Sequence, residues 1–279
     1  MEIIEQLREI AARSNQIRLL NVYQGVPISY PAAITAVTDN TLRVQTGRYQ
    51  LACLYLERET FIQSSHLPEI LKAKVLELDL PAQEASLGSF ELEQEQVGDR
   101  MVVRVQPKNP IESKIKTADP QALVRGELAD ISGDGMGIFI DRRAFLARRY
   151  RPGDLIEILL TLPVSPAYGG QSALDQSPHK DPISRFDRDN LRLYHVPGQG
   201  RQSAGPSSPS PRPAGPVDLV VRGQVVNVRE EAAHNRFRLG VRFRPEEPPP
   251  PAISQFIALR QAEILRELRE LSDMLVRGE

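Results

Sequence analysis

Short runs of β-branched and aliphatic residues, separated by turn-forming residues, recur through most of this 279-residue chain. Short strands at such close spacing indicate a small barrel or sandwich. The turn-like stretches in the first third are "QGVP", "TDN" and "TGRY". The runs interpreted as strands there are "IRLLNVY" (17–23), "PAAITAV" (31–37), "TLRVQT" (41–46), "LACLYLE" (51–57) and "ILKAKVLELDL" (70–80).

A helix is predicted ahead of these strands, over residues 1–12, because its apolar residues recur at helical spacing. The residues that share one face are Ile3, Ile4, Leu7, Ile10 and Ala11. Together, the helix and the strands predict a first domain over residues 1–95.

A second β-rich series begins near Gly98 and predicts a second barrel over residues 105–250, after a linker at 96–104. Its runs are "RMVVRVQP" (100–107), "IESKIK" (111–116), "VRGELADIS" (124–132), "GMGIFI" (135–140), "DLIEILLTLP" (154–163), "VDLVVRGQVVNVRE" (217–230) and "RFRLGVRF" (236–243). The last two runs indicate a hairpin around "EEAAHN".

Residues 165–216 interrupt this series with a stretch rich in Pro, Gly and Ser and poor in apolar periodicity. A structureless loop of that length is unusual inside a compact domain unless it is a disordered insert. Because strand-like runs resume after it, we predict an insert between two strands of one barrel.

A long helix is predicted near the C-terminus, over Ile253–Val276 within a last segment at 251–279. Its apolar stripe consists of Ile257, Ile264, Leu268, Leu271 and Leu275. The stripe is compatible with packing on the chain's own barrel or with a seam between copies of the chain, and both interpretations stay open.

Composition narrows the classes of partner and compartment. The formal net charge is −1, and aromatic residues make up 5% of the chain without any Trp, which argues against binding a nucleic-acid polymer. Cys53 is the single cysteine, lies in an apolar run and reads as a buried hydrophobe, so no internal disulfide is expected. No signal peptide and no membrane span are expected, so the prediction is a cytoplasmic protein.

The usual marks of catalysis are missing from the sequence. No phosphate loop, dinucleotide fingerprint or nucleophile elbow occurs, and the four histidines show no metal-ligand spacing. We therefore predict that the chain is not an enzyme and carries neither a metal nor a cofactor.

Two arginines stand four positions apart in "RMVVR", Arg100 and Arg104. On a straight strand both would face one side, and in a linker they could close around a ligand. The planar guanidinium binds phosphate oxygens in pairs and also recognises the O6/N7 edge of guanine. Taken alone, "RMVVR" is also compatible with a strand that carries two exposed arginines.

Twenty-odd residues later the chain reads "DISGDG", from Asp130 to Gly135. Asp130 accepts hydrogen bonds, which suits the N1–H and N2 amino donors of guanine, and Ser132 can donate or accept at short range. Gly135 removes side-chain bulk, so the backbone can approach a neighbour closely or take a positive φ. Taken alone, this stretch is also compatible with a simple hairpin turn.

In this order, the two motifs resemble the PilZ family of cyclic-di-GMP receptors, which carry RxxxR and then [D/N]xSxxG on a small β-barrel. The resemblance covers about residues 98–275 apart from the insert. Residues 1–95 are similar, more loosely, to the split-barrel-like domain that precedes PilZ in flagellar-brake-type proteins. The fold implied is mainly β, with two small antiparallel barrels, an N-terminal helix and a long C-terminal helix.

The resemblance implies a role for each matching residue. Arg100 and Arg104 would hold the guanines and phosphates of cyclic di-GMP, Asp130 and Ser132 would hydrogen-bond one guanine, and Gly135 would shape the turn. Asp99 stands where many members carry a basic residue, which favours one bound ligand or weaker binding. Further candidates for the site are Asp99, Gly133, Gly137 and Arg242.

The function implied is a signalling receptor in which ligand binding changes the arrangement of the domains and presents a surface to a protein partner, in control of motility or exopolysaccharide. "DRRAFLARRYR" (141–151) is a candidate for that surface. One alternative is an adaptor of the same fold that binds no ligand. A weaker one is a split-barrel flavin enzyme, which would be yellow when purified.

Overall fold

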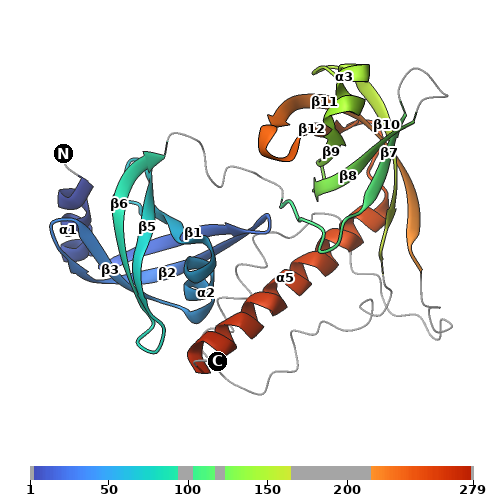
Figure 1. Ribbon diagram of the computed structural model, residues 1–279. Helices are drawn as coiled ribbons and strands as arrows, with labels where there is room; N and C mark the ends of the chain where they lie inside the picture. Colours follow the sequence, from blue (N-terminus) through green and yellow to red (C-terminus); the bar gives the residue numbers. More distant parts are fainter. Residues whose placement is uncertain (1–2, 94–102, 117–122, 165–214, 278–279) are drawn as a thin grey trace. The chain divides into compact units, whose positions relative to one another are not determined.

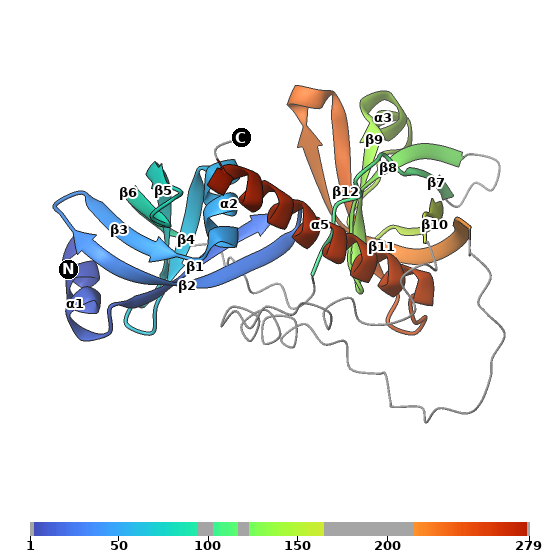
Figure 2. The same ribbon diagram turned by 90° about the horizontal axis from the view of Figure 1, so that it is seen from below.

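The computed structural model describes residues 3–93, 103–116, 123–164 and 215–277. The chain divides into two compact units, one formed by residues 1–101 with 261–279 and the other by residues 102–260. Each unit contains one closed antiparallel β-barrel, and a helix lies near each end of the chain (Figures 1 and 2). The predicted fold class is therefore confirmed.

The barrel of the first unit has the strand order β1-β2-β3-β6-β5-β4, and β4 closes onto β1. Alternate residues fill its interior, as with the fully buried Leu42 and Val44 of β3. The helices α1 and α2 lie at its two ends (Figures 1 and 2). The elements are α1 (Ile3–Arg13), β1 (Gln16–Tyr23), β2 (Val26–Val37), β3 (Thr41–Thr46), α2 (Arg48–Glu57), β4 (Glu59–Gln63), β5 (Ile70–Asp79) and β6 (Glu84–Glu93).

One predicted strand is wrong, because residues 51–57 belong to helix α2. Every residue from Gln50 to Leu54 is buried, so this part of the helix shows no polar face. A short unbroken apolar run does not distinguish a buried helix from a buried strand. The helix ends at Arg58, whose left-handed backbone (φ 57°) lets its N–H donate to the Leu54 carbonyl at 3.0 Å. Two strands that the runs did not predict, β4 and β6, complete the barrel.

Cys53 is fully buried in α2, as predicted, and burial raises the pKa of its thiol, with a smaller contribution from the charge of Glu57. Since the thiolate is the reactive form, Cys53 should not react with a disulfide reagent in the native protein and should react fully in urea. A Ser65→Cys variant, whose new thiol stands at an exposed turn, should gain one fast-reacting group. Rapid native reaction of Cys53 itself would contradict this burial.

The barrel of the second unit has the strand order β10-β11-β12-β9-β8-β7 and closes between β10 and β7. All predicted runs from residue 111 onward are strands here, including the hairpin around "EEAAHN". The elements are β7 (Glu112–Lys116), β8 (Leu123–Ile131), β9 (Gly135–Asp141), α3 (Arg142–Arg148), β10 (Leu155–Leu162), β11 (Val217–Glu231), the short 3-10 helix η2 (Ala232–His234) and β12 (Arg236–Phe243).

Two predicted segments of this unit, at 100–107 and 165–216, differ from the strands above. In "RMVVRVQP", the described part forms only an isolated bridge at Val105 and no strand, so the strand interpretation fails there. The predicted insert falls on 165–216, of which 165–214 lie outside the described residues. Its flanking strands pair directly, and Leu162 stands opposite Val217.

Helix α5 (Pro251–Arg277) confirms the predicted C-terminal helix, but its buried line differs from the predicted stripe. Ile264 and Leu268 are buried, whereas Ile257, Leu271 and Leu275 are only partly covered. The helix therefore buries one face within its own chain; a seam between copies stays a prediction. The full buried line is Ile253, Phe256, Arg260, Ile264, Leu268 and Ser272. None of the helices in the described ranges is long and apolar enough to cross a membrane.

Candidate functional site

The "DISGDG" stretch forms the tight connection between β8 and β9. The Ser132 backbone N–H donates to the Gly135 carbonyl at 2.8 Å, and its hydroxyl lies 2.6 Å from Asp134 Oδ1 and 3.0 Å from the same carbonyl. The Asp134 carbonyl accepts a hydrogen bond from the Phe243 N–H at 2.9 Å, which ties the turn to β12. Ser132 is fully buried, so its hydroxyl is used here to hold the turn.

Gly135 opens β9 and pairs with Arg242, at a point where the backbone of β12 lies close. A Cβ at this position would lie 2.3 Å from the Val241 carbonyl oxygen, a distance at which two atoms cannot coexist. The contact is with backbone, so no side-chain movement relieves it. The glycine that the sequence assigned to turn shape is therefore required by strand packing.

Asp130 lies near the end of β8, next to a β-bulge between Leu128 and Asp130. Without the bulge, these two residues would face the same side of the strand. Instead, Leu128 is in the barrel core while the Asp130 carboxylate lies over Gly137 of β9, with both oxygens 3.1 Å from where a Cβ would stand. The bulge thus directs the motif carboxylate to the outer face.

The Asp130 carboxylate is buried, with 6% of the residue exposed, and forms an ion pair with Arg238 of β12. Arg238 Nη2 donates to Oδ2, while Oδ1 is inaccessible and has no hydrogen-bond partner among the described residues. An unpartnered buried carboxylate oxygen is costly, because it has lost water without gaining a donor. It is also an acceptor that a ligand could use.

Two glycines make the surface under this ion pair flat. Gly137 and Gly240 stand opposite each other in the β9–β12 pairing, and we call this pair the glycine floor. A Cβ on Gly137 would lie 3.0 Å from Arg238 Nε, and one on Gly240 would lie 2.3 Å from Asn227 Oδ1. The floor therefore accommodates polar side chains from β8, β11 and β12 that larger residues would displace.

Arg104 is brought to the same end of the barrel by the bridge at Val105. The Val105 N–H donates to the Ile131 carbonyl at 2.9 Å and the Ile131 N–H donates back at 3.0 Å. Ile131 lies between the two polar motif residues, Asp130 and Ser132. Arg104 directly precedes Val105 and is therefore held next to the motif. Arg104 is half-buried and forms no ion pair with any described residue. Arg100 and Asp99 lie outside the described residues.

Helix α5 also binds the segment that carries this bridge. Arg260 of α5 is 3% exposed, and its Nε donates to the Gln106 carbonyl at 2.9 Å. The residues that follow Arg104 are therefore fixed both to β8 and to the C-terminal helix.

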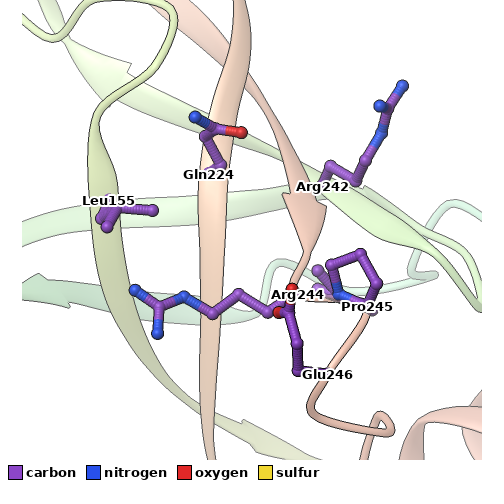
Figure 3. Close-up of a pocket in the computed structure, with 7 residues that line it drawn as sticks. Leu155, Gln224, Arg242, Arg244, Pro245 and Glu246 are labelled. Carbon is purple, nitrogen blue, oxygen red and sulfur yellow. The ribbon is translucent and has the colours of Figure 1, made fainter.

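Arg242, a predicted candidate, pairs with Gly135 and lines a surface groove of about 500 Å³. Figure 3 shows Arg244 reaching across β11 toward β10, whereas Arg242 points away from it. Within the described residues Arg242 forms no ion pair, and Arg244 lies 3.8 Å from Glu247. The groove is lined by Leu155, Gln224, Arg242, Phe243, Arg244, Pro245 and Glu246.

Glu157 on β10 binds Lys116 at 2.9 Å and Arg222 at 3.2 Å. These two hydrogen bonds, with that from Lys116 the larger influence, hold the pKa of Glu157 below its ordinary value. Of the two arginines that line the groove, Arg244 lies near Glu247, whereas Arg242 forms no ion pair with a described residue and remains available to an anion. No cluster of potential metal ligands occurs within the described ranges.

The structure thus gathers Arg104, Asp130, Ser132, Gly135 and Gly137 at one end of the second barrel, with Arg242 next to Gly135 and Gly133 in the turn. Sequence reasoning missed Arg238 and Asn227. A signal for the former was present, because arginines alternate with core residues along β12, with Leu239, Val241 and Phe243 inside. That alternation alone did not reveal which acidic residue the arginine meets.

No protein-family profile matches the chain, and no curated protein does. Among solved structures, the chain is similar to the inhibitor of motility MotI/DgrA of Bacillus subtilis, with 10% identity over 90% of this chain and 97% of that one, at a TM-score of 0.35. It is similar to MrkH of K. pneumonia in complex with c-di-GMP, with 11% identity over 96% of this chain and 95% of that one, at a TM-score of 0.35. It is also similar to YcgR of Escherichia coli in complex with c-di-GMP, with 14% identity over 98% of this chain and 93% of that one, at a TM-score of 0.33. Likeness this distant supports no functional argument.

Proposed function

We propose that the second barrel binds cyclic di-GMP and that the chain is a receptor rather than an enzyme. The observation that carries this proposal is the Asp130 carboxylate, buried on the glycine floor with one oxygen that no described residue binds. A buried carboxylate with a free acceptor is suited to the adjacent N1–H and N2–H donors of guanine. Adenine presents no such pair of donors on its corresponding edge, so the proposal favours guanine.

Arginines beside the motif are suited to bind the phosphates and to stack on the bases of the ligand. Arg104 stands beside the motif through the Val105–Ile131 bridge, and Arg242 stands beside Gly135. Guanidinium groups bind phosphate oxygens and stack on bases, which suits a ligand with two phosphates and two guanines. Arg100 would act with Arg104, as the motif spacing implies.

The output that we propose is a conformational switch. Ligand contacts to Arg104 would fix the segment that leads to Gln106, whose carbonyl binds Arg260 of α5. Ligand binding at the motif would thus act on the C-terminal helix and on the arrangement of the two units, and through it on a protein partner. The ligand shifts that equilibrium only by its differential affinity for the two arrangements.

The test is calorimetric titration of the purified chain with cyclic di-GMP. We expect saturable binding by the wild type and at least about tenfold weaker binding by Arg104→Ala, since a charge-assisted hydrogen bond contributes roughly 1.5–3 kcal/mol. The matched control is Arg125→Ala on β8, whose side chain is 85% exposed and distant from the turn in the chain. The stoichiometry distinguishes one bound ligand from two.

Absence of binding by folded wild-type protein would refute the receptor proposal and favour the adaptor alternative. One observation favours that alternative specifically, because Arg238 already occupies an oxygen of Asp130. In an adaptor, this ion pair would only stabilise the barrel, and no nucleotide would compete with it.

A further inference from the structure

We propose that Arg238 occupies the place of a guanine edge at Asp130, and that a guanine nucleotide binds by displacing it. This inference rests on the proposed function and adds the residue that opposes binding in the ligand-free protein. It makes affinity depend on a contact within the chain as well as on contacts with the ligand.

The chemical likeness between the two partners of Asp130 is close. A guanidinium and the N1–N2 edge of guanine both present neighbouring, nearly parallel N–H donors in a plane, and a carboxylate accepts from either in the same geometry. Arg238 is thus a substitute for the base, carried by β12, which is separated from β8 by β9.

The placement of the ion pair makes the two partners exclusive. Arg238 Nε and both Asp130 oxygens lie 3.0–3.1 Å from the same point, the position of a Cβ on Gly137. The carboxylate and the guanidinium therefore share the space above one glycine. With 6% of Asp130 exposed, a base cannot reach the carboxylate edge while Arg238 remains in place.

The exchange has a physical reason to proceed. Arg238 satisfies Oδ2 only and leaves Oδ1 buried without a donor from the described part of the chain, whereas a guanine edge satisfies both oxygens. Arg238 is also a third exposed, so its long side chain can turn outward and meet a ligand phosphate after release. A ligand that carries both a guanine edge and a phosphate replaces each lost contact.

The same comparison sets the class of ligand. A nucleotide without the paired donors, such as cyclic di-AMP, cannot take over the carboxylate from Arg238. Free phosphate can attract Arg238 but cannot satisfy Asp130. We therefore expect binding only when the two features occur in one molecule.

The experiment measures the affinity of wild-type, Arg238→Ala and Arg229→Ala chains for cyclic di-GMP, with cyclic di-AMP as the second ligand. We expect Arg238→Ala to bind cyclic di-GMP about tenfold more tightly than the wild type, with cyclic di-AMP still unbound. Arg229 faces Arg238 in the β11–β12 pairing and is exposed, so Arg229→Ala removes the same charge without freeing Asp130. It should not tighten binding.

Each result decides between the alternatives. Tighter binding by Arg238→Ala than by both the wild type and Arg229→Ala supports the exchange. Equal or weaker binding by Arg238→Ala, beside a wild type that binds, overturns the exchange and leaves the receptor proposal intact. If the folded wild type does not bind, the receptor proposal fails and the exchange fails with it. Should Arg238→Ala not fold, Arg238→Gln, which keeps most of the side-chain length without the charge, is expected to show the same order of affinities.

Discussion

Asp130→Ala is expected to reduce the affinity of the chain for cyclic di-GMP by at least about a hundredfold. The carboxylate is the proposed acceptor for both guanine donors, and two hydrogen bonds to a charged acceptor are worth roughly 1.5–3 kcal/mol each. Loss of the ion pair with Arg238 also leaves a guanidinium free to occupy the space of the base. Calorimetric titration measures the change directly.

The matched control for this variant is Glu127→Ala, which removes an exposed carboxylate from the same strand. It should bind as the wild type does. Thermal unfolding of Asp130→Ala must show a folded second barrel for the comparison to count. A folded Asp130→Ala chain that retains wild-type affinity would remove this residue from the site.

Gly135→Ala is expected to destabilise the second barrel by about 3 kcal/mol and lower its melting temperature by roughly 10 °C. The new Cβ would meet the Val241 carbonyl oxygen at 2.3 Å, so β9 and β12 must separate where they pair. This separation also disturbs the turn that Asp134 anchors to Phe243. Differential scanning calorimetry of the intact chain follows the change.

Gly215→Ala is the control, because a Cβ there has no atom within 4 Å. Both variants add one methyl group, so any difference between them reports the space around the glycine. A Gly135→Ala chain that melts within about 2 °C of the wild type would show that the two strands relax around the added carbon.

Most strands of the second barrel were predictable, because one face is buried and the other exposed, whereas β4 and β6 of the first barrel were missed. The alternation in β12 and the hairpin turn before it are local signals, and both were interpreted correctly. Helix α2 was not predictable in this way, because burial on all sides removes its periodicity. The line of α5 was only partly predicted, since Arg260 and Ser272 take buried positions that a purely apolar stripe assigns elsewhere.

In the candidate site too, residues close together in the sequence could be predicted and residues far apart in the sequence could not. Asp130, Ser132 and Gly135 are near neighbours in the chain, so their motif, together with "RMVVR" upstream, could be compared with a known family from the sequence. Arg238 is 108 positions from Asp130, and only the pairing of β8, β9 and β12 brings the two together. The bulge beside Asp130, which sets the face of the carboxylate, also leaves no mark in the run "VRGELADIS".

Because Leu162 pairs directly with Val217, the chain between β10 and β11 is a suitable place to insert another protein. Since β10 and β11 pair directly, lengthening the chain between them adds only about 0.6 kcal/mol for each doubling of its length. A fluorescent protein spliced into 165–214 would leave both strands in register. If ligand binding alters the strands on either side, that fusion would become a genetically encoded reporter of the nucleotide in living cells.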